Sequence, residues 1–409
     1  MKLSQILFKE HKARLIRKIW QVQAERSVTP TRAVQILSAL NVKIEDAVEV
    51  AFPPPKQNIN PDFPKKEPEK PKDYNDRSAF LFNEKYFLQA GMSQAQALTK
   101  TILVSNELPE SITEVKKHNP KINHQHVERL IKTTCIFDAQ QEKLPIVKDP
   151  ERPAWVFPRS YGITASRKMN NLARNLLQYC EILSGTRIAQ QRNIVQHGYI
   201  SCTFDHGPDV LSLAATIDFM ITSTMSEKLL KNPSPHEASE LPDLHPLHHM
   251  LGLTQSNIYK QQTVYPIHET SFWLKPHTII LHHDPESVKN LTELPVREDQ
   301  ILSQALMKSF ITAASYARIK HGNNVKELTE PVTVQCIQTN GQKYNFGALQ
   351  LNTLNFDRKD GLMNYWWFTP NMELYSKAQY ERGKPVCSDY NPEVFETLLA
   401  FYKNQPGIV

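Results

Sequence analysis

The segment from residue 298 to residue 353 constrains the fold most, because it predicts a helix, a loop and a β-hairpin in direct succession. Small and apolar residues recur three or four positions apart on two flanks of the helical part: Leu302, Ala305, Leu306, Phe310, Ala313, Ala314 and Ala317. Two such flanks predict a helix buried on more than one side. Gly322 follows its basic last turn and tolerates the positive φ at which many helices end.

The second half of this segment predicts two paired strands. Apolar residues alternate with polar ones over residues 332–336, which is typical of a half-buried strand. Asn340-Gly341 is a dipeptide that favours a tight hairpin turn, and residues 344–350 continue as the return strand. No catalytic motif lies in the segment.

The rest of the chain predicts an α+β protein in which helices pack on antiparallel hairpins. Periodicity predicts helices at 93–104 with Ser93 as cap, at 123–139, at 166–183 and from Asn391-Pro392 onward, and strands at 195–204, 210–221 and 278–282. These elements do not alternate as βαβ units do, which favours the α+β class.

Length and charge divide the chain into three parts. The 409 residues leave room for about two domains. We expect a targeting segment at 1–28, a helix plus a long proline-rich extended arm at 29–73, and an α+β globular region at 74–409. This region could divide into two lobes, at about 74–190 and 191–409. No apolar run of 18 residues predicts a membrane span.

Residues 1–28 resemble a mitochondrial targeting sequence. They hold seven basic and two acidic residues, and thus carry +5 of the chain's net charge of +6. A basic, acid-poor segment with interspersed apolar residues is typical of such a presequence, and no secretory signal is present. The alternative is a retained basic arm that contacts nucleic acid.

Cysteine and glycine usage excludes several kinds of site. The five cysteines are widely spaced and form no Cys-x-x-Cys pair, which predicts buried thiols in a reducing compartment. With 12 glycines, no P-loop and no GxGxxG, the sequence does not predict a phosphate-binding cradle.

Histidines supply the strongest chemical signal. Eight of fifteen lie between 236 and 283: His236, His245, His248, His249, His268, His277, His282 and His283. Their spacing matches no metal motif, and neither His236-Glu237 nor His268-Glu269 begins an HExxH sequence. Cys202 and His206 could be a nucleophile and a base, but no third member or oxyanion loop accompanies them. We therefore expect no catalytic residue, no metal and no cofactor.

Nucleic-acid binding would depend on a few basic spots, because the chain beyond residue 28 is nearly neutral. These spots are Lys116-Lys117-His118, Arg167-Lys168, Arg187 with Arg192, and Arg318 with Lys320. The aromatic run 365–368 could stack bases, but such a run is more often a packed strand or a protein-binding surface. We expect protein contacts to outweigh RNA contacts.

One family resembles this chain in an ordered, almost gap-free pattern. The matching residues include Ala317-Arg318, Gly322-Asn323, Lys326, Leu328, Pro331-Val332, Val334-Gln335, Thr339, Gly341, Phe346 and Gln350-Leu351-Asn352-Thr353, then Pro392-Glu393, Phe395, Leu399-Ala400 and Tyr402. They are similar to the pattern of the mitochondrial large ribosomal subunit protein 37 family. Weaker matches extend to about Tyr74, and residues 1–73 show none.

The resemblance implies a structural constituent of the mitochondrial ribosome large subunit and no catalytic residues. It implies contacts with other large-subunit proteins, side-by-side pairing with the related large-subunit protein 65, contact with mitochondrial large-subunit rRNA, and neither a membrane nor a small-molecule substrate. We expect the aromatic run and the last helix to form the adhesive surface. Two alternatives remain: a mitochondrial metal-dependent hydrolase using the histidines at 236–283, and a free mitochondrial RNA-binding factor.

Overall fold

The computed structural model describes residues 31–44, 78–144, 151, 160–206, 209–225, 229–236, 240–257, 263–283, 294–356 and 360–404. The chain forms two compact units, residues 1–69 and residues 70–409. In the first unit, helix α2 (Arg32–Ala39) contains no buried residue. The expected targeting segment and most of the proline-rich arm lie outside the described residues, so both stay predictions.

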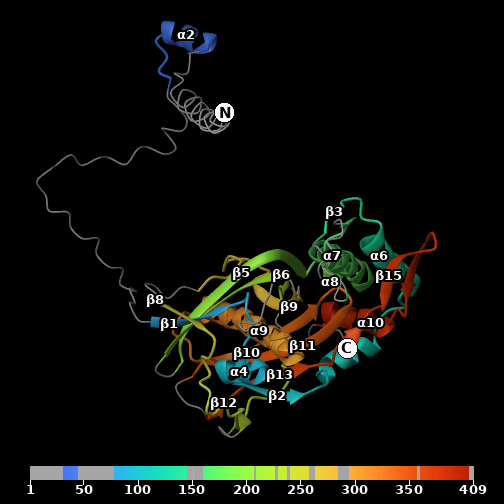
Figure 1. Cartoon of the computed structure of the whole chain (residues 1–409). Helices are drawn as coiled ribbons and strands as arrows, with labels where there is room; N and C mark the ends of the chain where they lie inside the picture. The colour runs from blue at the N-terminus through green and yellow to red at the C-terminus, as the bar shows by residue number, and fades with distance from the viewer. Residues whose placement is uncertain are drawn as a thin grey trace, which may run out of the picture. The chain divides into compact units, whose positions relative to one another are not determined.

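One mixed sheet organises the second unit (Figure 1). Among the described residues it contains β1 (Ser78–Asn83), β2 (Thr101–Ser105), β5 (Arg192–His206), β6 (Asp209–Ser223), β8 (Thr254–Asn257), β9 (Lys275–His282), β10 (Glu327–Thr339), β11 (Lys343–Thr353), β13 (Asn364–Phe368) and β14 (Met372–Glu373). The order is β2-β13-β11-β10-β9-β6-β1-β8, with β5 on β6 and β14 on β11. The expected division near residue 190 does not separate these strands, because β2 pairs with β13.

Most neighbouring strands in this sheet are antiparallel. The predicted hairpins β5–β6 and β10–β11 are both present, while β1–β6, β9–β10 and β2–β13 are parallel pairs. The other strands in the described part of the chain form three small sheets: β3 (Glu142–Lys143) with β4 (Tyr161–Gly162), β7 (Pro235–His236) with β12 (Gly361–Leu362), and β15 (Lys377–Glu381) with β16 (Lys384–Ser388).

Helices cover both faces of the sheet, and the α+β class is confirmed. Helices α4 (Gly91–Thr99) and α9 (Glu298–His321) share one apolar core with the strands. The other core contains α5 (Glu110–Lys117), α6 (His124–Ile136), α7 (Ala165–Ser184), α8 (Thr186–Ala189) and α10 (Pro392–Lys403). Strand side chains alternate between these cores, as β13 shows: Trp366 packs into the first, Tyr365 and Trp367 into the second.

The two helical layers explain one wrong prediction. Strand β10 is present, but it is not half-buried, because its polar residues Thr333, Gln335 and Gln338 are buried as well. Burial of an amide is tolerated when its hydrogen bonds are satisfied. The Gln335 amide nitrogen donates to Thr278 Oγ1 at 2.9 Å and to the Phe401 carbonyl at 3.0 Å. An alternating pattern therefore marked a strand, without showing that its polar face was open to water.

Helix α9 and the following hairpin match their predictions closely. All of α9 from Ser303 to Arg318 is buried except Lys308, as two apolar flanks predicted. Gly322 ends the helix with φ +92°. In the hairpin turn Gly341 has φ +91°, and the Asn340 side chain accepts hydrogen bonds from the backbone amides of Gln342 and Lys343.

The helix predicted for 93–104 is only half correct. Helix α4 begins at Gly91 rather than at a Ser93 cap and ends at Thr99, after which Lys100 adopts φ +50°. Residues 101–105 form strand β2, in parallel register with β13. β-Branched and apolar residues in this stretch gain more from sheet pairing than from another helical turn, so tertiary context decided the boundary.

Helix α10 begins as predicted, and its far end is anchored inside the protein. Asn391 accepts a hydrogen bond from the Glu393 amide at 3.0 Å, and Pro392 occupies the first turn. At the carbonyl end, Arg192 of β5 donates to the Tyr402 and Asn404 carbonyls at 3.2 and 2.9 Å. His277 Nε2 lies 2.7 Å from the same Asn404 carbonyl.

The first prediction concerns His277, which is fully buried. Burial, with the nearby Arg192 charge, holds the pKa of His277 well below its ordinary value, so the folded protein keeps this ring neutral. The unfolded chain binds that proton more readily, so the stabilisation present above about pH 6.5 is lost as the pH falls. We expect His277→Gln to be less stable at pH 7.5, by about 1–3 kcal/mol, because the buried contacts of the ring with Thr278 Oγ1 and the Asn404 carbonyl are altered.

The same variant should also have a shallower acid dependence. The variant chain takes up one proton fewer when it unfolds in acid. The slope of its unfolding free energy against pH is therefore lower by up to about 1.4 kcal/mol per pH unit. Urea denaturation from pH 7.5 to 5 measures both quantities, with exposed His268→Gln as the control. An unchanged slope in His277→Gln would contradict a neutral His277 in the folded state.

Candidate functional site

The structure disperses most of the histidines at 236–283. His277 contacts the Asn404 carbonyl at the end of α10, and His282 Nδ1 lies 3.6 Å from Asp218 Oδ1. His236 contacts the Tyr365 hydroxyl at 2.9 Å and Glu240 at 2.5 Å. These side chains contact different elements of the fold, so the eight histidines do not form one metalloenzyme centre among the described residues.

His248 and His249 are the exception, because their rings stack at a centroid distance of 4.2 Å. Asp209, the first residue of β6, joins them: one ligating atom from each of these three residues lies within 4.8 Å of the other two. His206, at the end of β5, packs beside His249 at 4.8 Å between ring centroids. Sequence reasoning missed Asp209, since it lies far from the histidines along the chain and no local motif marks it.

Cys202 and His206 do not form a nucleophile–base pair. Cys202 is fully buried in the α9 side of the core, and burial raises the pKa of its thiol to about 11. His206 lies four residues further along β5, where its ring stacks on Phe356 at 4.9 Å. Burial lowers the pKa of His206, so neither group has the pKa expected of a thiolate–imidazolium pair.

Several residues from the basic spots are engaged by the protein's own groups. The contacts are Lys116 with Glu393 at 2.8 Å, Lys320 with Glu330 at 3.1 Å, Arg167 with Asp138, and the buried Arg192 and Arg318 with backbone carbonyls. These cations therefore stabilise the fold, and fewer positive charges remain for phosphate groups.

The two segments expected to form an adhesive surface are in the core instead. Tyr365, Trp366 and Trp367 are buried, because β13 lies between β11 and β2 with a helical layer on each face. Helix α10 is buried from Val394 through Lys403 apart from Glu396. That expectation was wrong, since aromatic density alone does not distinguish an internal strand from a surface one.

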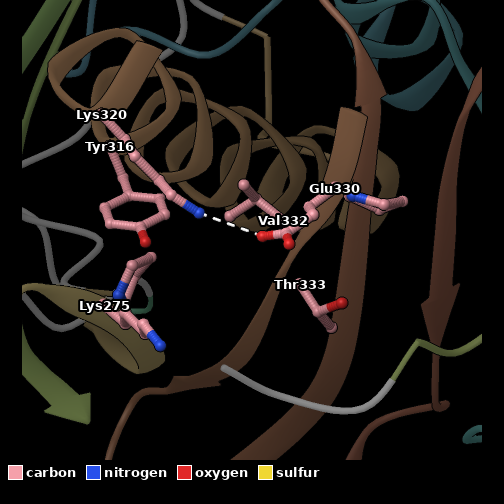
Figure 2. Close-up of a pocket in the computed structure, with 8 residues that line it drawn as sticks. Lys275, Tyr316, Lys320, Glu330, Val332 and Thr333 are labelled. Carbon is pink, nitrogen blue, oxygen red and sulfur yellow. Dashed lines mark hydrogen bonds and ion pairs between the residues drawn. The ribbon is translucent and has the colours of Figure 1, made fainter. Parts of the chain in front are cut away.

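A small pocket lies between α9, β9 and β10, and Figure 2 labels six of the residues that line it. Lys320 of α9 pairs with Glu330 of β10 at 3.1 Å, and Tyr316 lies beside Lys320, with Lys275 below Tyr316 in the view. Burial, with a smaller effect of Glu330, raises the pKa of Tyr316 to about 12. This phenol stays protonated near neutral pH, so Tyr316 itself does not act as a general base there.

Exposed aromatic residues mark a different surface, at the β15–β16 hairpin. Phe137, at the end of α6, is 53% exposed, and Tyr380 of β15 is 57% exposed. Their rings meet edge to face at 6.1 Å between centroids. We call these two residues the Phe137–Tyr380 patch. Paired exposed aromatics are characteristic of residues that become buried against a protein partner.

Helices among the described residues are too short or too polar to cross a membrane. This observation agrees with the lack of a long apolar run in the sequence.

Comparison with known proteins gives a consistent relationship. The chain is 24% identical to the large ribosomal subunit protein mL37 of Rattus norvegicus over 379 residues, covering 86% of this chain and 81% of the relative. The mL37 proteins of Gallus gallus and Mus musculus are also 24% identical, each over 80% of this chain. Residues 285–406 match a family model described as mitochondrial 28S ribosomal protein S30 (PDCD9). The resemblance predicted from the sequence is confirmed.

The second prediction concerns thiol reactivity. Cys135, Cys180, Cys202 and Cys336 are buried, and Cys387 is half-buried with its pKa raised to about 11 by burial. Because the thiolate is the reactive form, we expect iodoacetamide at pH 7.5 to label the native protein at least tenfold more slowly than the urea-unfolded protein. Mass spectrometry identifies which cysteines are labelled and how fast. Rapid labelling of native Cys202 would contradict this account and support a nucleophile.

Proposed function

We propose that this chain is a structural constituent of the large subunit of the mitochondrial ribosome. The observation that carries the proposal is its similarity to mL37 proteins over 80–86% of its length. The matching family model bears a small-subunit name, but it covers only residues 285–406. The longer matches favour the large subunit, and both descriptions are of mitochondrial ribosomal proteins. The protein accordingly resides in the mitochondrion.

The way polar groups are used supports a scaffolding role without catalysis. Buried polar side chains such as Gln335 and Arg192 bond to the protein's own backbone and side chains. Cys202 and His206, the pair considered as nucleophile and base, are not arranged for catalysis. A protein that acts by shape needs a rigid body and contact surfaces rather than reactive groups. The internal hydrogen bonds described above supply the rigid body.

Ribosomal proteins and ribosomal RNA are the partners that this role implies. The near-neutral charge beyond residue 28 and the internal pairing of several basic residues favour protein contacts over RNA contacts. Within that set we propose pairing with large-subunit protein 65. The Phe137–Tyr380 patch is our candidate for a protein contact, because it is exposed and aromatic.

The third prediction separates a ribosomal protein from a free RNA-binding factor. Mitochondrial lysate is fractionated on a sucrose gradient at high magnesium, and the chain is followed with an antibody. We expect it to co-sediment with the large subunit, and to remain with it after low magnesium separates the two subunits. Recovery near the top of the gradient would favour the free factor, and recovery with the small subunit would contradict the large-subunit assignment.

The fourth prediction tests the Phe137–Tyr380 patch. Both residues are more than half exposed, so Phe137→Asp with Tyr380→Asp should leave the fold intact. If the patch is buried against a protein partner, placing two charges there should reduce incorporation into the large subunit roughly tenfold or more.

Competition between tagged variant and wild-type chains, followed by gradient fractionation, measures this loss. Phe272→Asp is the matched control, because Phe272 is 84% exposed and lies outside the patch. Equal incorporation of the double variant and the wild type would remove the patch from the interface.

A further inference from the structure

Three potential metal ligands meet where the β5–β6 hairpin approaches the loop that precedes β8. Asp209 starts β6, and His248 and His249 lie in the loop. Their ligating atoms fall within 4.8 Å of one another. Asp209 and His249 are half-buried and His248 is exposed, so an ion could reach the group from solvent.

We propose that Asp209, His248 and His249 bind one Zn²⁺ ion. Two imidazoles and a carboxylate suit zinc, whereas Mg²⁺ and Ca²⁺ prefer all-oxygen ligand sets. Zinc–ligand bonds of about 2.0–2.2 Å place tetrahedral ligands about 3.3 Å apart. Each pair of ligand atoms needs to close by about 1.5 Å at most, which small side-chain rotations at all three residues would supply. Water would complete the tetrahedron.

The surroundings hold this loop in place before any ion binds. The buried Gln94 amide of α4 donates to the His249 carbonyl at 2.8 Å and to the Leu251 carbonyl at 2.7 Å. His206, paired with Asp209 across the hairpin, packs against the His249 ring on one side and against Phe356 on another. Anchored backbone and packed rings reduce the ordering cost of metal binding, as supporting contacts do in known metal sites.

Binding also has one local cost that can be observed. The Met250 amide donates to His248 Nδ1 at 3.2 Å. A neutral imidazole that ligates through one nitrogen carries its proton on the other, so His248 must give up this contact whichever nitrogen binds zinc. Zinc should therefore change the exchange rate of the Met250 amide hydrogen.

The ion would act as a cross-link rather than as a catalyst. It would join the loop around residues 248–249 to the β5–β6 hairpin, two segments that are distant in sequence. The inference is independent of the ribosomal role, and it differs from the sequence-based expectation of no metal, which could not include Asp209.

The fifth prediction is tested on the purified full-length chain. After loading with ZnCl₂ and desalting, elemental analysis should find one zinc per wild-type chain. Asp209→Asn, His248→Ala and His249→Ala should each weaken zinc affinity about tenfold or more, and exposed His268→Ala should bind as the wild type does. Circular dichroism checks that each variant is folded.

Two further readouts keep the proposal testable even if a variant fails to fold. Co²⁺ loading of the wild type should give tetrahedral d–d bands without a sulfur charge-transfer band, because no cysteine is among the ligands. Hydrogen exchange should change at Met250. Wild-type protein that retains no zinc, folded variants that retain it fully, or a sulfur–cobalt band would each overturn the site.

Discussion

The carbonyl end of helix α10 is held by three strands of the sheet, and this attachment fixes the helix over one of the two cores. Backbone carbonyls there have no partners within the helix, and burying them without donors would be costly. Arg192 of β5, His277 of β9 and Gln335 of β10 donate to residues 401–404, so three strands hold one helix terminus. Arg192 also places a positive charge where the helix dipole favours it, and this charge helps to keep His277 neutral.

This arrangement agrees with the proposed role of a protein that acts through its shape. Amides, a guanidinium and an imidazole that could have formed a reactive site are instead bonded to carbonyls inside the fold, and paired lysines such as Lys116 and Lys320 serve surface ion pairs. Exposed side chains such as Phe137 and Tyr380 remain available for partners. The similarity to mL37 proteins indicates the assembly in which we propose that this body serves, the mitochondrial ribosome.

Local patterns in the sequence predicted the elements that local physics determines. Helix α9, the Asn340-Gly341 turn and the Asn391 cap all follow from residues close in sequence, and each is present. Burial could not be predicted in the same way, because it depends on which layer covers a strand. The aromatic run of β13 and the partnership of Asp209 with His248 both arise from contacts between distant segments, which one sequence does not reveal.

The pairing of β2 with β13 has a consequence for how the protein is made. A chain that emerges with its N-terminus first holds residues 101–105 long before residues 364–368 exist to complete the sheet edge. The residues that receive Arg192 and His277 come later still, at 402–404. Contacts of such high sequence separation form slowly and leave apolar surface exposed meanwhile. The β2 edge of the sheet therefore stays without its β13 partner until residues 364–368 have been made.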